Sequence, residues 1–207
     1  MFAGLDLSSV SDLTALVLVG EDGDVLPIYW LPDEGLAEKS RNDRVPYDQW
    51  ARDGYLQTCP GRAIEYEFVA EYLRWVFDHY NVVRLNFDRY NMRHLRPWLE
   101  KAGFSDDELE LFVEYGQGFK DMSPALRELE SRLLSRKLRH GNHPVLSMCA
   151  ANAVAVSDPA GGRKFTKAKT TGRIDGMVAL AMALAAVGQE EANMIDIDSF
   201  INDPLVL

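Results

Sequence analysis

The chain has 207 residues, 47% of them hydrophobic, which is the size of one compact domain with its own core. Its formal net charge of −10 argues against a protein that coats nucleic acid through a uniformly basic surface. Two cysteines, Cys59 and Cys149, exclude a disulfide framework and favour a reducing cytoplasm. The first residues have the pattern of a strand and not of a signal or transit peptide, and no membrane association is expected.

The N-terminal part of the sequence predicts an antiparallel meander. Three short apolar segments are the predicted strands: residues 2–8, 14–19 and 25–30. A turn at residues 21–24 joins the last two, and Pro27 predicts that the third strand lies at a sheet edge. Residues 33–62 are polar and contain three prolines, so they are predicted to form an insertion or a lid loop with one short helix near residues 47–50.

The rest of the chain alternates between helical and strand patterns. Helices are predicted at residues 65–80, 92–102, 123–138 and 144–152, and strands at residues 82–88 and 109–115. Residues 153–170 predict a basic β-hairpin around a turn rich in Gly, Asp and Pro. A final helix begins at Asp175 and is apolar on nearly every side as far as Val187, so it is predicted to be buried. Residues 189–207 carry no Lys or Arg and form an acidic tail after a domain spanning residues 1–188.

This order of elements predicts an α/β fold. The sheet should be mixed, with an antiparallel three-strand meander followed by parallel strands, helices flanking it and a β-hairpin added. Three aspartates stand at corresponding places: Asp6 within the first predicted strand, Asp88 at the end of the fourth and Asp175 at the start of the last helix. If the first and fourth strands are neighbours, Asp6 and Asp88 can face one point, and the last helix can bring Asp175 to it. Each aspartate taken singly suits a turn or a helix cap. All three in this arrangement favour a metal site.

Clustered carboxylates raise each other's pKa unless a cation neutralises them. Hard oxygen ligands without a His or Cys partner favour Mg²⁺ or Mn²⁺ over zinc. A cluster of this kind suits two ions, one that activates a water and one that stabilises the leaving oxygen of a phosphodiester.

The basic residues are concentrated in one region. Residues 127–173 contain ten Lys or Arg against three acidic residues, a balance of +7, which leaves −17 for the rest of a chain whose total is −10. This distribution suggests a localised site for a polyanion, although solvated helix and loop faces explain it equally well. Five of the cations lead directly into Asp175 and are the candidate DNA contacts: Arg163, Lys164, Lys167, Lys169 and Arg173.

Four short motifs occur in a specific order along the chain: Gly4–Ser8, Phe87–Asn91, Gly116–Pro124 and Gly172–Gly176. Together with residues 138–146 and 149–152, the ordered set resembles the C-terminal nuclease domain of the large terminase subunit of tailed bacteriophages. The resemblance covers nearly the whole chain. It implies an RNase H-like fold.

The resemblance also implies a function, a site and partners. The expected activity is metal-dependent endonucleolytic cleavage of concatemeric double-stranded viral DNA during packaging, in the host cytoplasm and with little sequence preference. Asp6, Asp88 and Asp175 would be the catalytic ligands of two Mg²⁺ or Mn²⁺ ions, with Asp6 bridging them and Asp12 an auxiliary candidate. The implied partners are double-stranded DNA, a packaging ATPase domain or subunit, the portal and the small terminase subunit.

The sequence departs from the full subunit of that family in one respect, because it contains no Gly-x-x-x-x-Gly-Lys-Ser/Thr phosphate loop. The expectation is therefore an isolated nuclease domain or a split gene product without DNA translocation. Three alternatives stay open. An actin-like ATPase or sugar kinase also begins with a strand hairpin that carries an Asp, a Holliday-junction resolvase shares the expected fold, and an assembly module would use the aspartates only as caps.

Overall fold

The computed structural model describes residues 1–8, 12–167 and 172–202, without the side chains of residues 90 and 191–202. Its centre is a six-stranded sheet in the order β4-β3-β2-β1-β5-β6. The strands are β1 (Phe2–Asp6), β2 (Thr14–Val19), β3 (Val25–Pro32), β4 (Gln57–Cys59), β5 (Arg84–Phe87) and β6 (Phe112–Glu114). The pairs β1–β2 and β2–β3 are antiparallel, whereas β1–β5, β5–β6 and β3–β4 are parallel. The predicted mixed sheet, a meander followed by parallel strands, is confirmed.

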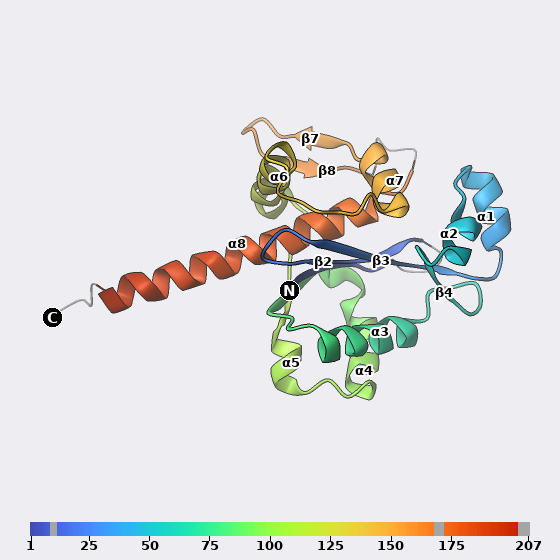
Figure 1. Ribbon diagram of the computed structural model, residues 1–207, viewed down its shortest axis with the longest axis horizontal. Coiled ribbons are helices and arrows are strands. Elements are labelled where there is room, and N and C mark those ends of the chain that lie inside the picture. Colours follow the sequence, from blue (N-terminus) through green and yellow to red (C-terminus); the bar gives the residue numbers. More distant parts are fainter. Residues whose placement is uncertain (9–11, 168–171, 203–207) are drawn as a thin grey trace.

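Helices cover both faces of this sheet (Figure 1). One face carries α6 (Phe119–Leu134), α7 (Pro144–Asn152) and α8 (Asp175–Asn202), and the other carries α3 (Tyr66–His79), α4 (Arg89–Lys101) and α5 (Asp106–Glu110). The predicted hairpin is a separate two-stranded sheet of β7 (Ala155–Ser157) and β8 (Arg163–Phe165). Two short helices, α1 (Leu36–Asp43) and α2 (Tyr47–Arg52), lie at the β3–β4 end of the sheet. No helix in the described part of the chain is long and apolar enough to cross a membrane.

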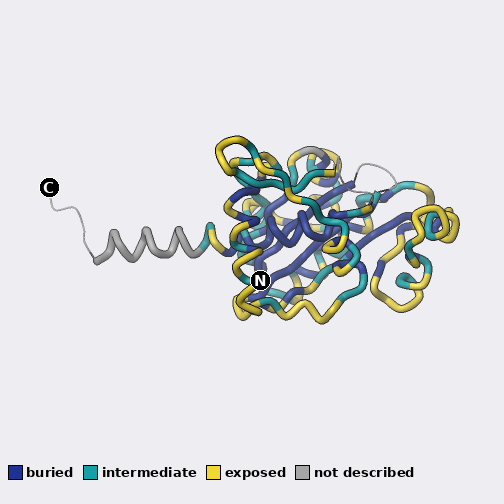
Figure 2. The backbone as a smooth tube through the Cα atoms, turned by 90° about the horizontal axis from the view of Figure 1, so that it is seen from above, coloured by how far each residue is buried: buried dark blue, intermediate teal, exposed yellow. Residues whose placement is uncertain are grey.

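The alternation of side chains along β2 divides the core into two layers. Val17 and Val19 belong to the layer under α8, and Leu16 and Leu18 belong to the layer under α3 and α4. Figure 2 shows the buried strands and the buried first half of α8 at the centre of the molecule. Gly4 sets how closely the helix approaches, because a Cβ there would lie 2.0 Å from the carbonyl oxygen of Ala179. The all-round apolar sequence of α8 therefore packs directly on the backbone of β1.

The segment at residues 33–62 differs from its prediction as a loop with one short helix. It contains α1, α2 and the edge strand β4. Short polar helices of this kind have weak periodicity, and α1 begins after Gly35 at a left-handed φ of 84°. The predicted edge position of Pro27 is confirmed. β4 pairs only with Trp30, Leu31 and Pro32, so the first half of β3, which contains Pro27, has β2 as its one neighbour. Proline has no N–H to donate and is tolerated where the strand has one neighbour.

Three further boundaries differ from the sequence-based expectation. The strand predicted at residues 109–115 is reduced to β6, because a capping box between Ser105 and Glu108 starts α5 just before it. The helix predicted at residues 123–138 begins at Phe119 and ends at Leu134, so Pro124 lies inside it. The final helix does not end near Val187, because α8 continues to Asn202 and extends away from the body (Figure 1).

Candidate functional site

The sheet brings Asp6 and Asp88 to the same edge. Asp6 is the last residue of β1, and Asp88 directly follows β5. These strands are parallel neighbours in which Leu5 pairs with Phe87, so the next residue of each strand emerges at the same level. Asp175 is the first residue of α8, one helical turn before the contact between Ala179 and Gly4. The three predicted aspartates therefore meet where α8 crosses the ends of β1 and β5.

A lysine from the hairpin lies between two of these carboxylates. The Nζ atom of Lys167 donates a hydrogen bond of 2.7 Å to Oδ1 of Asp175 and lies 3.7 Å from Oδ2 of Asp6. Lys167 was predicted as a DNA contact, and the structure places its ammonium group inside the carboxylate cluster. Gln117 was not predicted as a site residue, although it lies within one of the recognised motifs. Its Nε2 atom donates to Oδ1 of Asp6 at 3.4 Å.

The electrostatics of the cluster are dominated by burial. Asp6 is 5% exposed and Asp175 is 3% exposed. Burial raises the pKa of Asp6 to about 7, the charges of Asp175 and Asp88 add to this rise, and Lys167 and Gln117 oppose it. Burial lowers the pKa of the Lys167 ammonium group, but the charges of Asp6 and Asp175 outweigh it and the net change is upward. The cluster thus holds more negative charge than its own side chains neutralise.

The donor set fits a hard divalent cation in its chemistry. All three acidic groups offer carboxylate oxygens, and Oδ2 of Asp6 is buried without a hydrogen-bond partner. As the side chains stand, no three Asp, Glu, His or Cys residues within the described ranges are arranged to hold one metal ion. The positive charge at this place is the ammonium group of Lys167. A metal would therefore need the side chains to rearrange around it.

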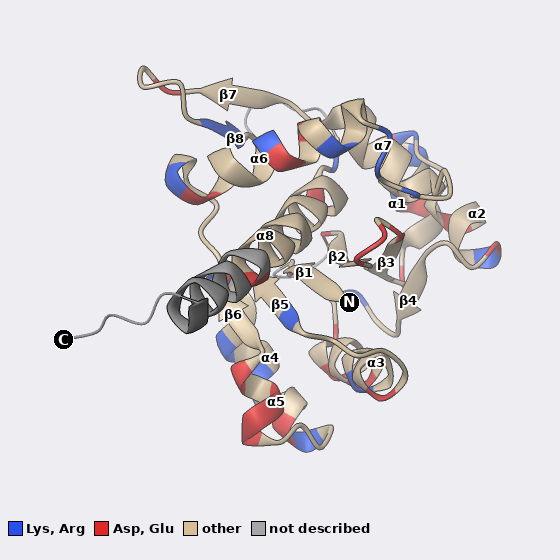
Figure 3. Ribbon diagram, turned by 60° about the vertical axis from the view of Figure 1, so that its left-hand side comes forward, with Lys and Arg blue, Asp and Glu red and all other residues tan. Residues whose placement is uncertain are grey.

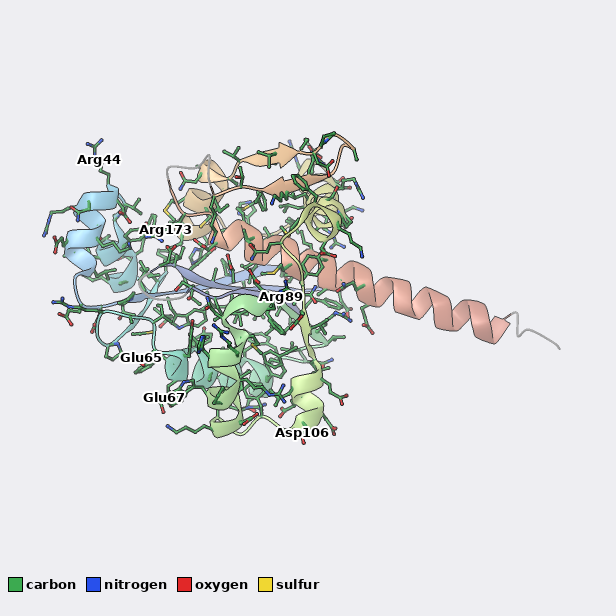
Figure 4. All side chains as sticks on the ribbon, turned by 180° about the vertical axis from the view of Figure 1, so that it is seen from behind. Arg44, Glu65, Glu67, Arg89, Asp106 and Arg173 are labelled. Atoms are coloured by element: carbon green, nitrogen blue, oxygen red, sulfur yellow. The ribbon has the colours of Figure 1, made fainter. Side chains whose placement is uncertain are left out.

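A cleft of about 410 Å³ opens beside Asp175. One wall comes from α1 and α2 through Asp43 and Tyr47, and the other comes from α7 and the segment before α8. Arg173 joins the two walls, because it forms ion pairs with Asp12 and, at 3.8 Å, with Asp43. Figure 4 shows Arg173 between the α1–α2 pair and the start of α8. Asp12, the auxiliary candidate, is thus the partner of Arg173 and lines the same cleft as Asp175.

Two other predicted DNA contacts, Arg163 and Lys164, are each engaged by a neighbouring side chain. Arg163 forms an ion pair of 2.7 Å with Glu130 of α6, and the Nζ atom of Lys164 lies 4.9 Å from the ring centroid of Phe119. Lys169 lies outside the described residues. Figure 3 shows β8, coloured blue at its Lys and Arg positions, beside α6, which has both blue and red positions. Of the four predicted contacts that the structure describes, Lys167 and Arg173 line the cleft beside Asp175.

Comparison with known proteins gives one family. The family model described as terminase large subunit, endonuclease domain, matches residues 1–191. The terminase large subunit of Enterobacteria phage HK97 is 48% identical over 209 residues, which cover 99% of this chain and 41% of that protein. Protein YmfN of Escherichia coli strain K12 is 26% identical over 188 residues, covering 87% of this chain and 40% of that protein. The chain spans about two fifths of the length of these curated relatives.

Two solved structures share the fold. The crystal structure of the HK97 bacteriophage large terminase matches with a TM-score of 0.82 at 48% identity, over 89% of this chain and 39% of that chain. The large terminase nuclease from thermophilic phage G20c matches with a TM-score of 0.55 at 10% identity, over 91% of this chain and 81% of that one, which shows the fold alone. The expected RNase H-like architecture with its added hairpin is confirmed. The chain belongs to the family of terminase large subunit endonuclease domains.

Proposed function

We propose that this chain is a metal-dependent endonuclease that cuts concatemeric double-stranded viral DNA during genome packaging, with little sequence preference. Family membership supports the activity class. The observation that carries the mechanism is the convergence of Asp6, Asp88 and Asp175, in which one buried carboxylate oxygen has no hydrogen-bond partner. Such a cluster is costly to the fold, and a bound cation would explain why it is there.

The proposed roles follow from position. Asp6, Asp88 and Asp175 would hold two Mg²⁺ or Mn²⁺ ions, and the charges of both Asp88 and Asp175 act on Asp6. When bound, the ions would supply Lewis-acid activation of the attacking water and neutralise charge on the phosphodiester. The amide of Gln117 holds Asp6 in its orientation. Lys167 and Arg173 line the cleft where a phosphate would approach Asp175, and Asp12 positions Arg173.

Contacts to phosphates carry no sequence information, which is why little sequence preference is expected. The other proposed partners are a packaging ATPase domain or subunit, the portal and the small terminase subunit, with the host cytoplasm as the site of action. They rest on the similarity to the HK97 large subunit, of which this chain covers 41%. The same similarity supports a nuclease over an actin-like ATPase or sugar kinase. A resolvase of the same fold would differ by preferring branched over linear DNA.

Cleavage of supercoiled plasmid in Mn²⁺, Mg²⁺ or EDTA tests the proposal. We expect nicking and linearisation with either ion and none in EDTA, and a rate reduced by more than about a hundredfold in Asp175→Asn, since that variant loses a ligand charge. Asp107→Asn is the matched control, because Asp107 is exposed on α5 on the far side of the sheet. Cleavage by Asp175→Asn at the wild-type rate would contradict the assignment. Absence of cleavage together with ATP binding would favour the actin-like alternative.

A further inference from the structure

Lys167 reaches the carboxylate cluster from the surface. Its side chain is 57% exposed, whereas the side chains of Asp6 and Asp175 are 7% and 5% exposed. It follows β8 by two residues and lines the cleft as well as the cluster. An exposed lysine side chain has many rotamers, and Lys167 already lines the cleft in its present position. The ammonium group can therefore leave without disturbing the core.

The same ammonium group neutralises the cluster incompletely. It donates a hydrogen bond to Asp175, but Oδ2 of Asp6 stays buried without a donor at a distance of 3.7 Å from Nζ. A divalent ion carries twice the charge and binds several oxygens at once, so it would satisfy both carboxylates better. The Lys167 ammonium group and a divalent ion cannot both lie between Asp6 and Asp175, because they would overlap and their like charges would repel.

We propose that Lys167 is an internal counter-ion that occupies the position of a divalent cation when no metal is bound, and that it moves to a DNA phosphate when the metal enters. This inference rests on the proposed nuclease function. It makes Lys167 a positioning residue with two alternating partners, the Asp6–Asp175 pair and the phosphate. The consequence is competition: metal entry must displace the lysine, and DNA in the cleft helps by offering the ammonium group a second anion.

Metal affinity in the absence of DNA gives the first test. Mn²⁺ binding is measured by titration calorimetry for the wild type, Lys167→Met, Lys167→Arg and the control Lys164→Met. Lys164 is on the same hairpin but contacts Phe119. We expect Lys167→Met to bind Mn²⁺ on the order of tenfold more tightly, because the competing charge is gone, and the arginine and Lys164 variants to stay near the wild type.

DNA affinity should change in the opposite direction. For Lys167→Met, we expect weaker binding to linear duplex when a divalent cation is present, because Lys167 of the wild type is then on a phosphate, and a salt slope that is shallower by about one phosphate contact. In buffer without divalent cations the difference from the wild type should be small. A lysine that only supports the fold would weaken both metal and DNA binding when removed. Tighter metal binding combined with weaker DNA binding is therefore the signature of the exchange. Unchanged or weaker Mn²⁺ binding by Lys167→Met would overturn the proposal.

A measurement on the wild-type protein keeps the test independent of variant folding. The reactivity of each lysine amine toward an acylating reagent is followed by mass spectrometry with and without Mn²⁺. We expect the reactivity of Lys167 to rise severalfold when Mn²⁺ is added and that of Lys164 to stay constant, and equal reactivity of Lys167 in both states would overturn the exchange. Mn²⁺ binding without plasmid cleavage would contradict the nuclease function alone, whereas cleavage with an unresponsive Lys167 would contradict this inference alone.

Discussion

Gly4 is the residue on which the contact between β1 and α8 depends. A Cβ at this position would lie 2.0 Å from the carbonyl oxygen of Ala179 and 2.7 Å from the amide nitrogen of Ala183. Both are backbone atoms of a buried helix and cannot move aside alone. We expect Gly4→Ala to lower the free energy of unfolding by at least about 3 kcal/mol, measured by urea denaturation.

Gly118 provides the control for this substitution. A Cβ there meets no atom within 4 Å, and its φ of −78° is accessible to every residue. Gly118 is the N-cap of α6, where Ala is less favourable than Gly, so we expect Gly118→Ala to lower the stability by no more than about 1 kcal/mol. If Gly4→Ala were equally harmless, α8 would not pack on β1 as closely as described. Gly4→Ala would also shift Asp175 relative to Asp6, so this variant should lose cleavage activity as well as stability.

The sequence predicts the acidic half of the site better than the basic half. Asp6, Asp88 and Asp175 each stand at the end of a regular element, and the order of the elements is enough to bring them together. The partner of Lys167 depends on the path of the chain as it leaves β8, which no periodicity encodes. Gln117 lies in the loop between β6 and α6, and only its place within the motif Gly116–Pro124 indicates a role for it. Sequence patterns therefore do not predict the contacts of side chains that lie on irregular segments.

One ion pair joins α3 to α5. Glu108 caps α5 through Ser105 and accepts a hydrogen bond of 2.8 Å from Arg74 of α3. The Arg74 guanidinium and the backbone N–H of Ser105 lower the pKa of Glu108 from 4.5 to about 2. Since this pKa is depressed in the folded state, the ionised form contributes stability above about pH 4.5, and the contribution is lost as the pH falls toward 2.

We expect Glu108→Gln to lower the free energy of unfolding by about 1 kcal/mol near pH 7, a value reduced from the full pKa shift because the side chain is 32% exposed. Near pH 3 the difference from the wild type should narrow, because the wild-type carboxylate is partly protonated there. Urea denaturation at both pH values measures this difference in the free energy of unfolding, and Glu110→Gln on the same helix is the control. An equal difference at both pH values would mean that packing, and not charge, is lost.

Elements with strong periodicity are the ones whose predictions hold. The buried strands and α3 have regular apolar patterns, and the structure confirms them with boundaries shifted by one or two residues. The segment at residues 33–62 has no such pattern, because α1 and α2 are short and mostly polar. Their buried residues are Leu36 and Tyr47. The start of α6 was also predicted wrongly. Pro124 is typical of the first turn of a helix, but the first turn of α6 begins at Phe119, after Gly118.

Two local rules account for the pairing types in most of the sheet. Sequential antiparallel strands pair as a meander, and a strand that follows a helix pairs in parallel through a right-handed crossover. β1 pairs with β2 on one side and with β5 on the other, so it lies between them and its C-terminal end is at the site. The addition of β4 to the opposite edge could not be foreseen, because it depends on the path of the insertion.

The charge of the whole molecule limits how it can bind DNA. The chain carries a net charge of −10, and many cations of its basic region are paired internally. Four arginines are paired in this way: Arg132 with Glu128, Arg139 with Asp24, Arg163 with Glu130, and Arg173 with Asp12. Each of these would have to exchange a carboxylate for a phosphate, so binding should engage few new phosphates.

We therefore expect a shallow dependence of duplex affinity on salt, with a slope of log K against log salt between about −2 and −4. Fluorescence anisotropy with a labelled duplex over a series of salt concentrations measures the slope, and a random-sequence duplex of equal length should give the same value. A slope near −9, as expected if all ten cations of residues 127–173 bound phosphates, would show that the internal ion pairs open on DNA. The basic region would then be a continuous track, and the choice between these outcomes decides whether Lys167 and Arg173 alone guide the DNA to the carboxylates.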